Sequence, residues 1–183
     1  VMKKPDKKII LKIVIPVVIV VAIAGIWFWK NYDRKSDIAL NAPLVQPVKE
    51  EHFALNASEL DMEAWKSYNL PIVLDFGSDS CLPCVSFYPT LKTVHAEMYG
   101  RVIIKYIDVY KYSKESSVYP VQVIPTQIFI NADGTPYVPS KNIDVEFITY
   151  NLRETGEHAY TVHEGVLTKD QFLSILRDMG VKE

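Results

Sequence analysis

The two cysteines of the chain, Cys81 and Cys84, lie between a predicted strand and a predicted helix. The segment Pro71–Phe76 is short, apolar and rich in β-branched residues, which is typical of a buried strand. Apolar residues then recur at helical spacing over Leu82–Tyr99, where Pro89 predicts a kink. A buried strand that passes directly into a long helix indicates an α/β domain and places both cysteines at the start of that helix.

The remaining pattern extends this unit into a layered domain. Two connections that contain helices predict parallel pairing of the first three strands, and a late hairpin predicts antiparallel strands. The expected fold is therefore α/β, with a mixed central sheet flanked by helices. Further elements are predicted as a helix opened by a capping box at Ser58–Asp61 and running to Tyr68, strands at Arg101–Val109, Thr126–Ile130, Val145–Leu152 and His158–His163, a short helix at Lys114–Tyr119, and a final helix opened by a capping box at Thr168–Gln171.

The N-terminal part of the chain predicts one transmembrane helix over residues 9–29. This apolar run would form a helix roughly 30 Å long, enough to cross a bilayer core. Lysines are more frequent before the run than after it, which favours a cytoplasmic N-terminus and an extracytoplasmic C-terminal domain. The alternative is a cleaved signal peptide, because Ala22-Ile-Ala24 resembles a cleavage site.

The domain organisation follows from these elements. Residues 1–8 form a basic cytoplasmic N-terminus, residues 9–29 the transmembrane helix, residues 30–57 a linker and residues 58–183 the folded domain, with an extended hairpin region at 135–163. The chain has a net charge of −2, but residues 1–35 are basic and the remainder is acidic. An acidic domain repels nucleic acid, so we expect no nucleic-acid partner.

The position of the cysteines favours redox chemistry. Backbone N–H groups and the helix dipole stabilise a thiolate at a helix N-terminus, which should lower the pKa of Cys81. Cys84 lies one turn further on and can resolve a mixed disulfide formed at Cys81. Three alternatives remain: a zinc site, which would need about four ligands; a copper site completed by His95 or His163; and a structural disulfide, which would close too short a loop to stabilise much.

Several motifs follow one another along these elements: Asp75-Phe76, Cys81-Leu-Pro-Cys84, the kink proline Pro89, Lys105, Val123-Ile-Pro-Thr126 and Glu164-Gly165. With these motifs in this order, the sequence resembles the thioredoxin family from Glu59 to Val181. The chain departs from the family at Gly77 and Ser80, where thioredoxins usually carry tryptophans. It also departs at 135–163, which is longer than the family's hairpin, and in its predicted membrane anchor.

The resemblance implies a thioredoxin-like fold and a role for each matched residue. Cys81 would be the nucleophile and Cys84 the resolving thiol, and no cofactor would be needed beyond their redox-active disulfide. Asp75 would carry the proton of Cys84, since burial raises the pKa of a carboxyl group. Lys105 would support Asp75. Pro83, Ile124 and Pro125 would bind substrate, with Ile124–Pro125 as a cis peptide bond.

Together with the predicted transmembrane helix and its orientation, these roles imply a membrane-tethered, extracytoplasmic thiol-disulfide oxidoreductase. Its partners would be protein thiols and disulfides, with a polytopic membrane thiol carrier as electron donor. The Leu-Pro dipeptide and Ile124 favour a reductase, and cytochrome c maturation is one setting for such a protein. A disulfide-forming oxidase, a redox-inactive binding module and a copper carrier remain as alternatives.

Overall fold

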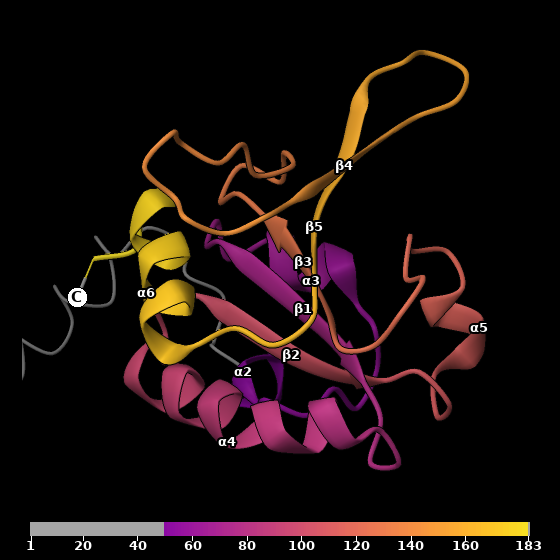
Figure 1. Cartoon of the computed structure of the whole chain (residues 1–183), viewed down its shortest axis with the longest axis vertical. Helices are drawn as coiled ribbons and strands as arrows, with labels where there is room; N and C mark the ends of the chain where they lie inside the picture. The colour runs from indigo at the N-terminus through magenta and orange to yellow at the C-terminus, as the bar shows by residue number, and fades with distance from the viewer. Residues whose placement is uncertain (1–49, 183) are drawn as a thin grey trace, which may run out of the picture. The chain divides into compact units, whose positions relative to one another are not determined.

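The structure is a computed structural model that describes residues 50–182. Within that range a five-stranded sheet with the order β2-β1-β3-β5-β4 forms the centre of the domain (Figure 1). The predicted N-terminus, transmembrane segment and most of the linker lie outside the described residues. Among the helices of residues 50–182, none combines the length and apolar character that a bilayer crossing needs.

The sheet is mixed, as predicted. Strand β1 (Ile72–Gly77) pairs in parallel with β2 (Ile103–Asp108) on one side. On its other side it pairs with β3 (Thr126–Ile130), which pairs with β5 (His158–Glu164), and β4 (Ile148–Asn151) forms the far edge.

The prediction that β3 runs parallel to β1 is wrong, because the two strands are antiparallel. The first residue of β3, Thr126, pairs with Phe76 near the end of β1, so β3 begins at the edge where β1 ends. The connection from β2 therefore does not have to cross the length of the sheet, and it contains only the one-turn helix α5 (Ser113–Ser116).

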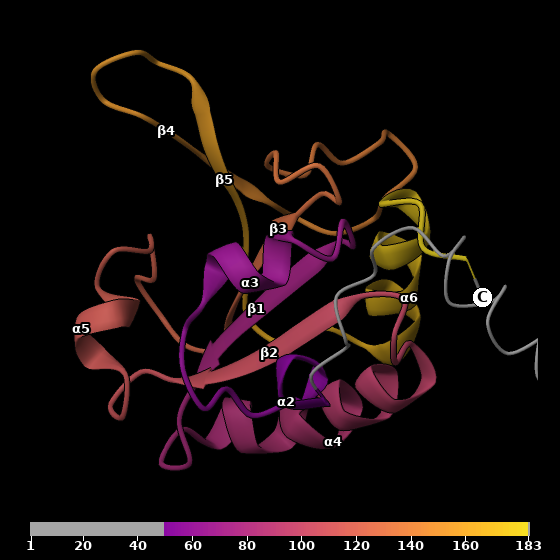
Figure 2. The same ribbon diagram turned by 180° about the vertical axis from the view of Figure 1, so that it is seen from behind.

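Helices cover both faces of the sheet (Figures 1 and 2). Helices α4 (Leu82–Glu97) and α6 (Lys169–Asp178) share one apolar core cluster with Val73 of β1. Helices α2 (Glu50–Phe53) and α3 (Met62–Lys66) pack on the other face, with the neighbouring β1 residues Ile72 and Leu74. This division follows from the alternation of side chains along a strand.

The domain begins earlier than predicted. The predicted linker runs to residue 57, but Phe53, Leu55 and Ala57 are buried in the core. The backbone N–H of Tyr106 in β2 donates to the carbonyl of Leu55, and Ala57 N–H donates to the carbonyl of Tyr106. Apolar residues in this stretch lack a sustained period, which is why the sequence pattern places them in a linker.

Of the two predicted capping boxes, the structure contains one. Thr168 and Gln171 form the predicted capping box of α6. The other prediction is wrong, because α3 is capped by the Asp61 carboxylate, which accepts from Ala64 N–H at 2.9 Å, and not by Ser58. The Ser58 hydroxyl donates instead to the Glu51 carboxylate at 2.7 Å.

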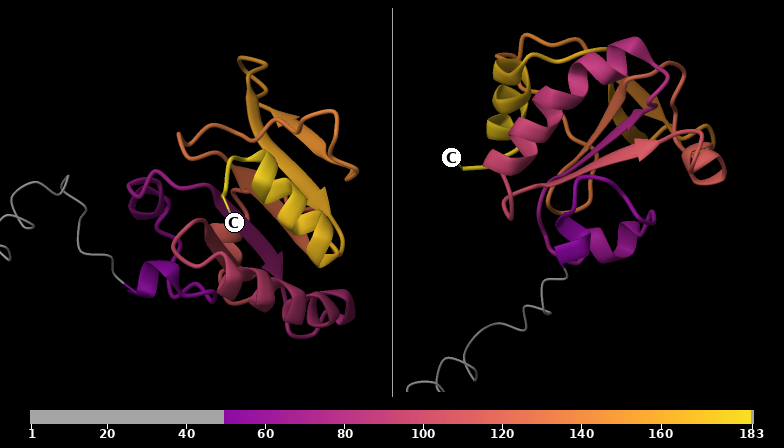
Figure 3. Two further views of the ribbon diagram at one scale, coloured as in Figure 1. Left: turned by 90° about the vertical axis from the view of Figure 1, so that its left-hand side faces the viewer. Right: turned by 90° about the horizontal axis from the view of Figure 1, so that it is seen from below.

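The region 135–163 contains the predicted hairpin in its second half. Strands β4 and β5 pair in antiparallel register, and their connecting loop projects beyond the rest of the sheet (Figures 1 and 3). Gly156 in that loop has a φ of 72°, a left-handed conformation that favours glycine. The first half of the region is irregular and packs Tyr137 into the core with 2% exposure.

Candidate active site

Cys81 and Cys84 form a disulfide at the N-terminus of α4. Cys81 is the N-cap of the helix, and Cys84 N–H donates to Cys81 Sγ at 3.2 Å. Pro83 occupies the first turn, where its missing N–H leaves no hydrogen bond unmade. The sulfur of Cys81 therefore lies where helix N–H groups stabilise negative charge.

The two cysteines differ in their access to solvent. Cys84 is 3% exposed, whereas Cys81 is partly exposed beside the exposed residues Leu82 and Pro83. A substrate disulfide can therefore reach Cys81 but not Cys84. This asymmetry agrees with the expectation that Cys81 is the more exposed thiol of the pair.

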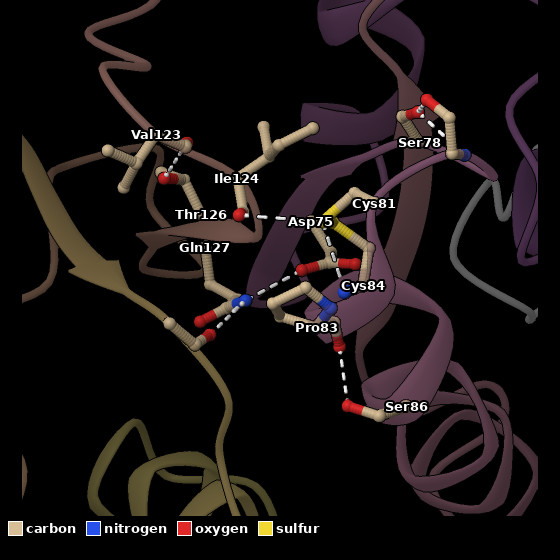
Figure 4. The surroundings of a disulfide bond; sticks show 12 residues. Asp75, Ser78, Cys81, Pro83, Cys84, Ser86, Val123, Ile124, Thr126 and Gln127 are labelled. Carbon is tan, nitrogen blue, oxygen red and sulfur yellow. Dashed lines mark hydrogen bonds between the residues drawn. A yellow bond between two sulfur atoms is a disulfide. The ribbon is translucent and has the colours of Figure 1, made fainter.

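The loop before β3 faces the disulfide (Figure 4). The Ile124–Pro125 peptide bond is cis, as predicted. Cys81 Sγ lies 3.6 Å from the carbonyl oxygen of Ile124. Gly165, which follows β5, donates from its N–H to the Pro125 carbonyl at 2.8 Å, so the Glu164-Gly165 motif supports the same loop.

Three exposed apolar side chains belong to the segments around Cys81 and were not predicted as site residues. Leu82 is 83% exposed, Val123 51% and Val166 48%. Leu82 follows Cys81, Val123 precedes Ile124, and Val166 follows Gly165, whose N–H bonds to the Pro125 carbonyl. Exposed apolar side chains of this kind are typical of surfaces that bind another protein.

Asp75 is buried on β1, as predicted, with 2% exposure. Burial raises its pKa to about 7, and a hydrogen bond from Gln127 opposes the shift. Gly77, two residues further along β1, shares the face of Asp75, and a Cβ built on it would lie 3.4 Å from Cys84 Cβ. The Asp75 carboxyl group therefore lies on the face covered by the start of α4 (Figure 4).

Lys105 does not lie beside Asp75, and the expectation that it supports the buried acid is wrong. Its ammonium group donates to the carbonyls of Glu51 at 3.1 Å and Ala54 at 2.7 Å and lies over the Trp65 ring. These partners belong to the face of the sheet opposite α4. Strand alternation explains the difference, because Lys105 points the same way as Ile103 and Ile107.

Tyr106 is a further residue of the site that the sequence did not indicate. It pairs with Asp75 across β1 and β2, and its ring would lie 2.8 Å from a Cβ on Gly77. Together with Tyr88 and Cys84 it lines a cavity of about 580 Å³ beside the start of α4. Burial raises the pKa of Tyr106, and Asp79, Asp108 and Asp75 raise it further.

The histidines considered as copper ligands bond to the backbone of the domain. His95 Nε2 lies 2.7 Å from the Phe53 carbonyl, and His163 Nδ1 lies 3.0 Å from the Glu146 carbonyl. Among residues 50–182, no group of three or more His, Cys, Asp or Glu side chains could hold a metal ion.

The fold and the Cys-x-x-Cys disulfide define a thioredoxin-like domain. In a comparison with known protein families, the thioredoxin family model matches residues 52–148. The chain therefore belongs to the thioredoxin family. No curated protein matches the chain.

The solved structure of chloroplastic thioredoxin z shares the fold. Chloroplastic thioredoxin z superimposes with a TM-score of 0.50 at 23% identity, covering 69% of this chain and 94% of that one. The germline-specific thioredoxin Deadhead of Drosophila melanogaster gives a TM-score of 0.42 at 19% identity, covering 63% of this chain and 87% of the other. At 23% identity the likeness to thioredoxin z concerns the fold alone.

Proposed function

We propose that the protein is a thiol-disulfide oxidoreductase that acts on protein substrates through Cys81 and Cys84. The observation that carries the proposal is the disulfide at the start of α4, with one accessible sulfur facing the Ile124–Pro125 loop. A structural disulfide would gain little from so short a loop. The exposed Leu82, Val123 and Val166 support a polypeptide substrate.

The reaction begins with the dithiol form. The Cys81 thiolate attacks a substrate disulfide, forms a mixed disulfide and releases one substrate thiolate, which takes up a proton. Asp75 then accepts the proton of the Cys84 thiol. The Cys84 thiolate attacks Cys81 Sγ, the bond between Cys81 and the substrate breaks, and the second substrate sulfur leaves as a thiolate, which takes up a proton. The protein disulfide is formed and the substrate disulfide is reduced.

We place Pro83, Ile124 and Pro125 in substrate binding. Pro83 is exposed next to Cys81, and the Ile124 carbonyl lies close to Cys81 Sγ. A peptide in extended conformation beside this loop could pair with the Ile124 backbone, which is a common way for proteins to bind strands. Pro125 itself is buried and shapes the loop.

The direction we propose is reduction of extracytoplasmic protein disulfides. The Leu-Pro dipeptide between the cysteines supports this direction, because it resembles the reducing members of the family. The apolar run at residues 9–29 and the lysines before it support a membrane tether with the domain outside. A reductase there needs electrons, and a polytopic membrane thiol carrier is the donor we propose.

Insulin reduction by dithiothreitol tests the activity. The domain should accelerate precipitation of the insulin B chain, and Cys81→Ala should abolish the acceleration. Ser80→Ala is the matched control, because Ser80 is the exposed neighbour of Cys81 and has no part in the exchange. A wild-type domain no faster than Cys81→Ala would refute the proposal.

Protease accessibility tests the tether. A cysteine-free reporter fused after Glu183 should be digested in intact spheroplasts and should sediment with the membrane fraction. Protection of the reporter until the membrane is dissolved would contradict the proposed orientation. Recovery of the full-length fusion in the soluble fraction would contradict the tether.

A further inference from the structure

Four polar residues form one row across the face of the sheet that α4 and α6 cover. Tyr106 of β2 pairs with Asp75 of β1, Asp75 with Gln127 of β3, and Gln127 with His163 of β5. Residues directly opposite one another on paired strands share a face. Their neighbours on this face include the apolar Val73 and Phe129 of the core cluster under α4 and α6.

Gln127 links the buried acid to the backbone around the disulfide. Its side chain is completely buried, and Nε2 donates to Asp75 Oδ1 at 2.7 Å and to the Gly165 carbonyl at 3.2 Å (Figure 4). Gly165 in turn donates to the carbonyl of Pro125. A continuous hydrogen-bonded chain therefore runs from the Asp75 carboxyl group to the loop that faces Cys81.

Packing alone does not explain a glutamine at position 127. Its Oε1 is buried and has no hydrogen-bond partner among residues 50–182. A buried acceptor without a partner destabilises a fold, and an apolar side chain of similar size would avoid that loss. The amide therefore has a use that offsets the unpaired oxygen, and its bond to Asp75 supplies one.

We propose that Gln127 is the positioning residue of the buried acid: its amide holds the Asp75 carboxyl group and ties it to the backbone of Gly165. The inference rests on the proposed function, in which Asp75 carries the proton of Cys84. This role requires no contact between Gln127 and the reacting sulfurs. It acts through Asp75, by fixing where the carboxylate lies and by stabilising its ionised form.

The hydrogen bond from Gln127 also changes the pKa of Asp75 in the direction that this role requires. An N–H that donates to a carboxylate favours the charged form, so Gln127 lowers the pKa of Asp75 against the effect of burial. The other titratable groups that face the acid are Tyr106 on β2, His163 beyond Gln127 on β5, and the cysteines at the start of α4. Gln127 itself carries no charge, so its replacement by an apolar residue neither adds nor removes one.

Direct titration of the Asp75 carboxyl group tests the proposal. In the oxidised protein, the ¹³C shift of this carboxyl group should report a pKa of about 7, the result of burial opposed by the Gln127 hydrogen bond. Gln127→Leu should move the midpoint upward by about one pH unit, because one charge-stabilising hydrogen bond is lost. Gln127→Met provides the same test if the leucine variant does not fold.

The exchange rate should follow the titration. With the midpoint one unit higher, the ionised fraction of Asp75 at pH 7 falls about five-fold. Resolution of a mixed disulfide by Gln127→Leu should slow by that factor at pH 7 and recover at pH 9. A residue that only packs the core would slow the reaction equally at all pH values.

His163→Gln is the matched control, since it removes the other titratable side chain next to Gln127 and keeps a group that can bond the Glu146 carbonyl. It should leave the Asp75 midpoint in place. An unchanged Asp75 midpoint in folded Gln127→Leu and Gln127→Met would overturn the proposal. Because the titration needs no substrate, this outcome is separate from a failure of wild-type protein to reduce insulin, which would refute the proposed function.

Discussion

Asp75 and Lys105 lie on opposite faces of the central sheet, although their strands are neighbours. Asp75 is on the side of α4 and the disulfide, and Lys105 bonds to the carbonyls of Glu51 and Ala54 on the other side. The proton chemistry of the site is therefore separate from the buried lysine, which instead holds the N-terminal segment of the domain against β2.

Replacement of Lys105 tests whether the lysine only holds the N-terminal segment or also acts on the proton chemistry of Asp75. Lys105→Met should leave the rate of disulfide exchange and its pH profile unchanged. It should lower the free energy of unfolding by about 1–3 kcal/mol, because the carbonyls of Glu51 and Ala54 lose their charged donor. Urea unfolding and insulin reduction measure the two effects. A pH profile displaced as in an Asp75 variant would show that the lysine acts on the acid after all.

The raised pKa of Asp75 predicts how stability depends on pH. The folded state keeps the proton up to about pH 7, whereas an unfolded aspartate loses it near 3.8, so stability falls between these values and is level above them. Across this pH range the raised pKa of Asp75 removes roughly 4 kcal/mol of stability, because the unfolded state gives up the proton that the folded state still keeps.

Asp75→Asn should remove this pH dependence. The variant should be more stable than wild type at pH 8, and the difference should vanish near pH 4. Urea unfolding of both oxidised proteins across this range measures the difference. A constant gap between the two proteins at every pH would mean that the Asp75 carboxyl group titrates normally.

The different exposure of the two sulfurs predicts which cysteine meets substrate. Cys84→Ala should accumulate mixed disulfides with target proteins, because nothing resolves the bond to Cys81. Cys81→Ala should accumulate none, since Cys84 is only 3% exposed. Non-reducing gels of cells that express each variant compare the two. Equal capture by both variants would contradict the assignment of Cys81 as nucleophile.

Gly77 accommodates the Tyr106 ring. A Cβ at residue 77 would lie 2.8 Å from a ring carbon of Tyr106, so Gly77→Ala should displace the ring and destabilise the domain by about 1–3 kcal/mol. Tyr106→Ala opens the space, and Gly77→Ala should then have a smaller effect in that background. Unfolding of the four proteins in this cycle measures the coupling. Additive effects would mean that the two residues do not compete for the same space.

The sequence predicts the elements that have strong local patterns. The strand at Ile72–Gly77, the helix at Leu82–Glu97 and the capping box at Thr168 all follow from periodicity and end signals within a few residues. The direction of β3 depends on where the chain from β2 returns to the sheet, which no local pattern encodes. The burial of Phe53 likewise depends on contacts with residues far along the chain.

Some residues of the candidate site could likewise be predicted from the sequence and others could not. The cysteine pair, the cis bond at Pro125 and the burial of Asp75 were accessible from motifs and their order. Gln127 was hidden, because a single glutamine in an apolar strand carries no motif. Its alternation with Ile128 was a usable signal, since a polar residue inside a fully buried strand needs a partner on a neighbouring strand.

The reduction potential of the Cys81–Cys84 couple tests the central claim most directly. Equilibration of the domain in glutathione redox buffers, followed by alkylation and mass measurement, gives the fraction of disulfide at each potential. A reductase predicts a single two-electron transition near the value of about −270 mV typical of thioredoxin. A midpoint above about −180 mV, in the range of disulfide-forming proteins, would contradict the direction of the reaction. A pair that does not exchange with glutathione would contradict the redox function itself.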